Sequence, residues 1–323
     1  MEGSISGRQT GAWGFCAVSV PAVLTCAGLG WGWVLLGCAI AAAYYFLTQE
    51  LASGAVYLPE LTMRAFGKPA GRAFLGLGGV FTLLAAAQTA ARAGIAFPDG
   101  TAKLAGAVLA LLGTLAGERG AKQAAKVCGV LFLILAGLYT IMILAAAKNV
   151  ELRWMKPWGG ARQTLEVIPA LLILTCLRFL PGRTQPVKSR WLGALLLCPA
   201  ILAAVTAGCL SSRLTQQLTF PFYTVSQSLS VLGVMERLEP VVSAALLLGF
   251  FALESLLLEA GREQIVWAAP GIAEKRWTRF ALGAAAFGLS FLTDGIPAAA
   301  WALGAAVCWG ITPLLTQLIV AIK

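Results

Sequence analysis

The chain contains no histidine in 323 residues. Without imidazole, Ser-His-Asp and Cys-His catalysis are excluded, and a metal would find no histidine ligand. We also find no pair of carboxylates at catalytic spacing and no nucleotide-binding motif. The sequence therefore predicts a protein that is not an enzyme, with no metal and no cofactor.

Charged residues are scarce, at 12% of the chain, whereas a soluble domain carries about 25%. The net charge of +10 comes without a basic cluster interleaved with aromatics, so nucleic acid is not an expected partner. The eight cysteines lie in apolar runs and form no Cys-x-x-Cys pair. They are typical of small buried apolar side chains rather than of disulfides or metal sites.

Long apolar runs make up much of the sequence. Hydrophobic residues make up 59% of the chain, mean hydropathy is +0.82, and apolar stretches of membrane-spanning length recur throughout. These features predict an all-α integral membrane protein, a single polytopic domain over 1–323. We expect ten spans, at about 11–27, 33–49, 73–96, 101–116, 127–147, 164–180, 191–210, 240–259, 278–293 and 298–321.

The basic residues predict how the chain is oriented. With the N-terminus in the cytoplasm, 16 of the 24 Lys and Arg residues fall in inside loops and 8 in outside loops. This bias favours both termini in the cytoplasm and an even number of spans. The polar start, "MEGSISGRQTGAWG", does not have the features of a cleavable signal peptide.

Ten spans with both ends inside is a size at which five-plus-five inverted-repeat transporters occur. In that architecture the first and sixth helices are interrupted near the bilayer midplane, and their free backbone groups hold a substrate. The first span has Gly11, Gly14, Ser19 and Pro21, and the sixth has Pro169 near its start. Ordinary kinks are the alternative explanation, because Gly and Pro are common in membrane helices.

Several short motifs resemble one family. "ISGRQ" at 5–9, "YLPELTMRAFGKPAGR" at 57–72, "GERGAK" at 117–122 and "FPFYTVSQSLSVLGVMERLEP" at 220–240 are similar in order and spacing to stretches of the endospore germination receptor B subunits, the GerAB-type spore permeases. The resemblance covers nearly the whole chain. The chain is shorter than usual for the family, and Glu254 stands where the family pattern usually has a lysine.

This resemblance implies a fold of the amino acid–polyamine–organocation superfamily. It implies a multi-pass protein of the spore inner membrane or cell membrane, in contact with lipid and beside an A-type and a lipoprotein C-type subunit. It also implies a role in sensing small nutrients such as amino acids. A working secondary transporter (permease) of amino acids or cations is the alternative, because both functions need a central pocket.

Polar residues inside the spans are the candidates for that pocket, because charge is costly at the bilayer centre. Gln88 and Arg92 are four residues apart on one helix face, where they could hold a carboxylate. Alternatively, Arg92 reaches the outer interface and Gln88 bonds a neighbouring helix. Thr175 and Cys176 lie midway along the sixth span, where a broken helix would expose backbone, although the threonine hydroxyl could bond its own helix instead.

Glu254 is the carboxylate deepest in an expected span, and Ser255 lies beside it. At that depth a carboxylate is paired, protonated or facing water. It could bind a ligand amine or a cation in the central cavity, or it could pair with Arg262 or Arg178.

Together these residues predict one midplane cavity. We expect Gln88, Thr175 and Glu254 to converge there with the first-span stretch from Gly14 to Ser19. Backbone N–H groups of the broken helices would bind a carboxylate, and Glu254 would face an amine.

The segment 220–239 is too polar to span a bilayer and too apolar for a solvated loop. Phe222 begins a stripe of apolar residues at three- and four-residue steps, which predicts an amphipathic helix, or two short ones hinged at Gly233. We expect an interfacial lid helix across the outer mouth of the bundle, with Phe222, Glu236 and Arg237 in gating roles. A helix that rests on lipid is the alternative.

Overall fold

The computed structural model describes residues 5–51, 57–93, 102–118, 120–158, 167, 170–181, 189–215, 217–218, 220–228, 239–272, 277–293 and 296–322. Every regular element over these residues is a helix. The expectation of an all-α protein is therefore confirmed.

The main helices of the bundle are α1 (Gly7–Leu24), α2 (Trp31–Leu51), α3 (Leu58–Arg92), α4 (Ala102–Glu118), α5 (Ala121–Ala147), α7 (Ser189–Leu210), α10 (Glu239–Ala268) and α11 (Trp277–Thr293). Between them lie the short elements η1 (Cys26–Gly28), η3 (Leu152–Trp154), η5 (Ile173–Phe179), α8 (Ser212–Thr215), α9 (Pro221–Ser228) and η6 (Pro270–Ile272). The last segment consists of α12 (Ala298–Ala305), the π-helix η7 (Ala306–Ile311) and α13 (Thr312–Ile322).

Within the described part of the chain, five helices are long and apolar enough to cross a membrane. They are Trp31–Thr48, Leu58–Arg92, Ala121–Ala147, Pro240–Ala268 and Ala298–Ile322. Two shorter apolar helices accompany them, at Ala170–Phe179 and Leu197–Leu210. This is the composition and helix length of an integral membrane protein.

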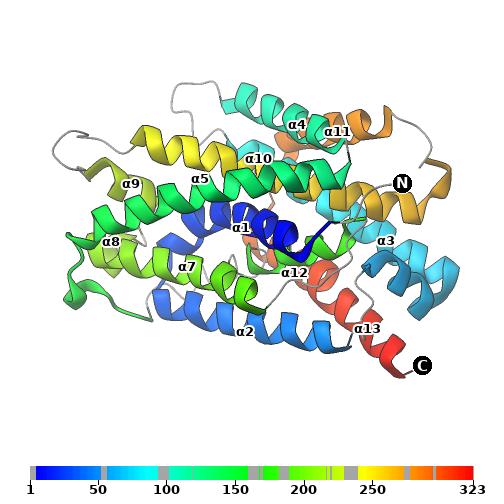
Figure 1. Ribbon diagram of the computed structural model, residues 1–323, viewed down its shortest axis with the longest axis horizontal. Helices are drawn as coiled ribbons and strands as arrows, with labels where there is room; N and C mark the ends of the chain where they lie inside the picture. Colours follow the sequence, from blue (N-terminus) through cyan, green and yellow to red (C-terminus); the bar gives the residue numbers. More distant parts are fainter. Residues whose placement is uncertain are drawn as a thin grey trace.

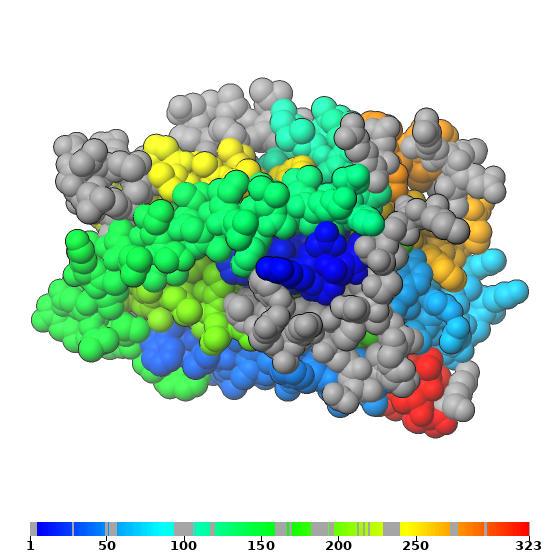
Figure 2. All heavy atoms as spheres, viewed as in Figure 1, coloured from blue at the N-terminus to red at the C-terminus, as the bar shows by residue number. Residues whose placement is uncertain are grey.

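The helices form one elongated bundle in which α10 is central (Figure 1). It packs against α1, α3, α4, α5 and α11. The indole N–H of Trp13 on α1 donates to the Ala252 carbonyl of α10 at 2.9 Å, fully buried. On the face shown in Figure 2, α5 covers much of the surface and leaves α1 visible in a narrow strip.

The first helix is not broken where the sequence predicts a break. α1 runs as an α-helix through Gly14 and Ser19 to Leu24, and a capping box between Ser6 and Gln9 starts it. The small residues instead allow close packing, because a Cβ on Gly249 of α10 would lie 2.8 Å from Ser19 Oγ. Glycine and serine at such contacts let membrane helices approach closely.

The sixth segment does depart from the α-helix. After a short α-helical piece at 170–172, η5 continues as a seven-residue 3-10 helix. Runs of this kind longer than three or four residues are uncommon. A second irregularity is the π-helix η7 in the last segment, and its residues contact η5.

The segment expected to form the lid begins with a helix, α9, which packs on α1, α7 and α10. Phe222 and Val225 are buried, while Gln227 and Ser228 are exposed, so the apolar stripe faces the protein. Gly233, Glu236 and Arg237 belong to residues 229–238, which lie outside the described part of the chain.

Candidate functional site

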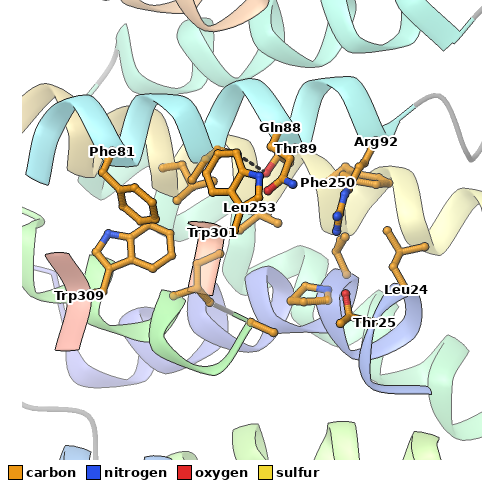
Figure 3. Close-up of a pocket in the computed structure, with 16 residues that line it drawn as sticks. Leu24, Thr25, Phe81, Gln88, Thr89, Arg92, Phe250, Leu253, Trp301 and Trp309 are labelled. Atoms are coloured by element: carbon orange, nitrogen blue, oxygen red, sulfur yellow. Dashed lines mark hydrogen bonds between the residues drawn. The ribbon is translucent and has the colours of Figure 1, made fainter. Parts of the chain in front are cut away.

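A cavity of about 90 Å³ lies between α1, α3, the sixth segment, α10 and the last segment (Figure 3). A single buried water needs roughly 10–15 Å³ measured in this way, so the cavity has room for a small solute. Elements from both halves of the sequence form its walls, and most of their side chains are apolar.

One stripe of α3 forms the longest wall. Phe81, Ala85, Gln88 and Arg92 follow one another at steps of three or four residues, so all four face the cavity. Phe81 and Arg92 are eleven helical steps apart, which gives the wall a length of about 16 Å. The cavity therefore has two distinct ends.

The end at Arg92 is polar and open. Arg92 lies in the last turn of α3 and is exposed, and its side chain points toward Thr25, just past the end of α1 (Figure 3). Gln88 lines the wall one turn further in, and Thr89 beside it bonds the Ala85 carbonyl at 2.9 Å. No ion pair of Arg92 occurs among the described residues. A guanidinium in this position can bind a carboxylate through two parallel hydrogen bonds.

The opposite end is aromatic. Phe81 packs against Trp309 with ring centroids 5.0 Å apart and against Trp301 at 5.8 Å. The indole N–H of Trp309 donates to Thr82 Oγ1 at 3.2 Å, which fixes the ring against α3. The faces of these rings offer a site for an apolar group or for an ammonium.

Only two of the predicted pocket residues, Gln88 and Arg92, line this cavity. Thr175 is only two residues from the lining residue Ile173, but its hydroxyl lies on the α2 side of η5, 3.3 Å from the Tyr45 hydroxyl. Cys176 is fully buried beside it. These two residues occupy the interface between α2 and η5 rather than a cavity.

The serine hydroxyls of α1 and α10 form hydrogen bonds within their own helices. Ser19 Oγ donates to the Cys16 carbonyl at 2.6 Å, and Ser255 Oγ donates to the Ala252 carbonyl at 2.9 Å. Gly14 lies buried in the α-helical part of α1. None of them contributes free backbone groups to the cavity.

Glu254 is also absent from the cavity, contrary to the expected convergence. The cavity is lined on α10 by Phe250, Leu253 and Leu257, and Glu254 faces away, toward α4. Its Cγ lies 3.1 Å from where a Cβ on Gly113 would be. The glutamate is completely buried, and neither oxygen has a hydrogen-bond partner in the described part of the chain.

The aromatic lining was not predicted from the sequence. Trp301 and Trp309 lie within the expected last span, whereas most other tryptophans flank spans. An indole N–H deep in an apolar run favours a nearby acceptor, and that preference was the available signal for Trp309, whose N–H binds Thr82. The buried N–H of Trp301 has no partner among the described residues.

Further along α10, an ion-pair network joins this helix to α11, and a hydrogen bond extends it to the residue before α3. Arg262 Nη2 binds Glu263 at 2.5 Å and Glu259 at 3.2 Å, and Arg279 lies 3.6 Å from Glu259. Arg262 is thus not the partner of Glu254. Tyr57 Oη, just before α3, donates to Glu263 at 2.7 Å.

Arg178, the other basic residue considered for Glu254, is buried at the end of η5. It donates to the side-chain carbonyl of Gln317 on α13 at 2.8 Å, with the Gln317 amide oriented so that its nitrogen donates to the Thr48 carbonyl. The contact connects the sixth segment to α2 and α13.

The chain matches no model of a known protein family and no curated protein.

Proposed function

We propose that this chain is the membrane subunit of a spore germinant receptor and that it senses a small amino-acid-like nutrient in the cavity between α1, α3 and α10. The observation that supports this most directly is the polarity of the cavity. Arg92 and Gln88 stand at one end, and Phe81, Trp301 and Trp309 stand at the other.

A ligand of this class matches both ends. Its carboxylate would bind the Arg92 guanidinium, with the Gln88 amide as a second donor. Its body would lie against the aromatic rings, which attract an apolar side chain or an ammonium. A volume of about 90 Å³ favours small nutrients over large ones.

The wider assignment is a ten-span, five-plus-five transporter-like bundle in the spore inner membrane or cell membrane. Each of the ten expected spans contains a helix, and the sixth is irregular, whereas α1, the other helix that this architecture interrupts, is continuous to Leu24. The start of α1 and the end of α13 lie toward the same end of the bundle (Figure 1), which supports two cytoplasmic termini. Because the motifs resemble B subunits, the proposed partners are an A-type subunit and a lipoprotein C-type subunit.

Binding of labelled amino acids to the purified chain in nanodiscs tests the sensing role. Arg92→Ala should weaken binding by roughly 10- to 150-fold, because a hydrogen bond to a charged group contributes about 1.5–3 kcal/mol. Arg64→Ala, a change at an exposed arginine that pairs with Glu60, is the control and should leave affinity unchanged. Equal affinity of the Arg92 variant and the wild type would contradict the proposed site.

One observation favours the alternative, a working secondary transporter of amino acids or cations. The cavity is open at Arg92, whereas on the other side the ion pairs of Arg262 lie further along α10, past the lining residue Leu257. Closure on one side of a central site is what alternating access requires. Uptake of labelled amino acid into proteoliposomes that contain this chain alone would support the transporter, and binding without uptake would support the receptor.

A further inference from the structure

A second and larger hollow lies on the outside of the bundle. It measures about 530 Å³ and runs between α2, the sixth segment and the last segment, with almost wholly apolar walls. On α2 its wall is the stripe Trp33, Leu36, Gly37, Ile40, Ala41 and Tyr44. We call it the α2 groove.

The α2 groove is continuous with the surface that the bundle turns to the hydrocarbon. Leu36 and Ile40 on one wall and Ile311 on the other are 44%, 62% and 51% exposed. Leu35 and Leu47 extend the exposed apolar face of α2 beyond the groove. In a helix that crosses a membrane, such a face contacts lipid chains.

The length and position of the groove fit one lipid chain. From Trp33 to Tyr44 the α2 wall measures about 16 Å, close to the roughly 15 Å of hydrocarbon in one leaflet. At its Trp33 end, Trp33 packs edge-on against Trp158 at 5.1 Å, and Trp31 donates to the Met155 carbonyl. Tryptophans gather in this way at the level of the headgroups.

The groove and the central cavity lie back to back. Leu171 and Leu172 line the groove, while their neighbours Ala170 and Ile173 line the cavity. The π-helix η7 is shared as well, with Gly310 in the groove wall and the Trp309 ring in the cavity. One part of the common wall is thus the π-helix η7, and the other is the junction at which the α-helical piece 170–172 passes into the 3-10 helix η5.

Tyr44 connects the two sides of that wall. Its ring lines the groove, and its hydroxyl lies 2.9 Å from the Trp309 carbonyl and 3.0 Å from the Gly310 carbonyl. A chain in the groove would press on Tyr44 and Gly310, and therefore on the segment that positions Trp309.

We propose that the α2 groove binds one acyl chain of a bilayer lipid, from the leaflet whose headgroups lie at the level of Trp33, and that its occupancy alters the central cavity through η7. The acyl-chain site does not depend on the nutrient that the cavity takes.

Photo-crosslinking tests the site directly. The full chain in phospholipid nanodiscs receives a trace of phosphatidylcholine that carries a diazirine in mid-chain, and labelled residues are mapped after illumination. Labelling on α2 and η7 should exceed labelling of lipid-facing α5 residues such as Leu133 about tenfold, a preference of about 1.4 kcal/mol. Labelling spread evenly over lipid-facing helices would overturn the site.

The second measurement uses a variant whose new side chain fills the α2 groove. A Cβ on Gly310 would meet its nearest atom at 3.5 Å, so Gly310→Leu can place a side chain in the groove and should reduce labelling there to the α5 level. Gly137→Leu, on an α5 position with no atom within 4 Å of an added Cβ, is the matched control. Retained labelling in the Gly310 variant would also overturn the site.

Coupling to the cavity is measured without a nutrient. A cysteine replaces Gln88, and its rate of reaction with a small water-soluble thiol reagent reports access to the cavity; the chain without this change gives the background. Gly310→Leu should change that rate several-fold, whereas Gly137→Leu should not. An unchanged rate beside a lost crosslink would refute the coupling and leave the lipid site standing.

Discussion

Glu254 and Glu259 lie five residues apart on α10, both almost completely buried, but only Glu259 is paired with cations. Arg262 and Arg279 approach Glu259 from its own helix and from α11. Glu254 faces Gly113 of α4, and its oxygens have no partner among the described residues. The two glutamates on this helix are therefore expected to have opposite effects on stability.

This contrast predicts changes of opposite sign. Glu254→Met should raise the free energy of unfolding by about 1–3 kcal/mol, because it removes an unsatisfied buried polar group. Glu259→Met should lower the free energy of unfolding by about 3 kcal/mol, which is the low end of the cost of breaking a buried ion pair. The low end applies because Arg262 remains paired with Glu263. Thermal unfolding of both variants in the same detergent measures the difference. If both lost stability equally, Glu254 would have a partner outside the described residues.

Thr82 holds the aromatic end of the cavity. Its Oγ1 accepts from Trp309 at 3.2 Å and from Gln264 at 3.3 Å, and its hydroxyl donates to the Gly78 carbonyl. Thr82→Val would leave two buried donors without an acceptor, at a cost of at least about 2 kcal/mol.

Thr82→Ser keeps the oxygen and should cost only about 1 kcal/mol, for the lost methyl group. Thermal unfolding in detergent distinguishes the two variants. Equal losses would show that the hydroxyl contributes no more to stability than the methyl group does.

Gly106 sets the distance between α4 and α3. A Cβ there would lie 2.5 Å from the Ala90 carbonyl oxygen, which is backbone and can move only with its helix. Gly106→Ala should therefore destabilise by about 1–3 kcal/mol through overpacking.

Gly137→Ala provides the contrast for this prediction. No atom lies within 4 Å of an added Cβ on Gly137, so alanine should stabilise α5 by up to about 1 kcal/mol. Thermal unfolding compares the two. A neutral Gly106→Ala would mean that α3 and α4 separate at little cost.

Much of the bundle follows from local features of the sequence. Apolar runs predict where helices lie, and the spacing of Gln88 and Arg92 predicts that they share a face, because helix periodicity depends on neighbours in the chain. The direction of Glu254 was not predictable in this way. Its rotation on α10 is determined by which helices surround α10, and periodicity cannot orient a helix that is apolar all round.

The expectation of a break in α1 was wrong for a related reason. Glycine and serine occur both where a membrane helix is interrupted and where it packs closely, and only the position of Gly249 opposite Ser19 distinguishes the two. The aromatic end of the cavity likewise depends on the contact between Phe81 and Trp309, 228 positions apart in the chain.

Tyr57 predicts how stability depends on pH. Burial, followed by the nearby charge of Glu263, raises the pKa of the Tyr57 hydroxyl above its ordinary value of 10. Above about pH 10 the unfolded chain loses this proton while the folded chain keeps it. The contribution of Tyr57 to stability is therefore fully present below about pH 10 and falls as the pH rises further. The slope cannot exceed about 1.4 kcal/mol per pH unit, because a single proton distinguishes the two states. Solvent around the partly buried ring lowers the total effect.

Tyr57→Phe isolates this effect. Near pH 8 the variant should be less stable than the wild type, because it loses the bonds to Glu263 and from Trp267. Between about pH 9 and about pH 11 the Tm difference between the two proteins should shrink, since phenylalanine has no proton to lose. Curves that stay parallel over this range would show that the Tyr57 proton is lost as easily from the folded protein as from the unfolded chain.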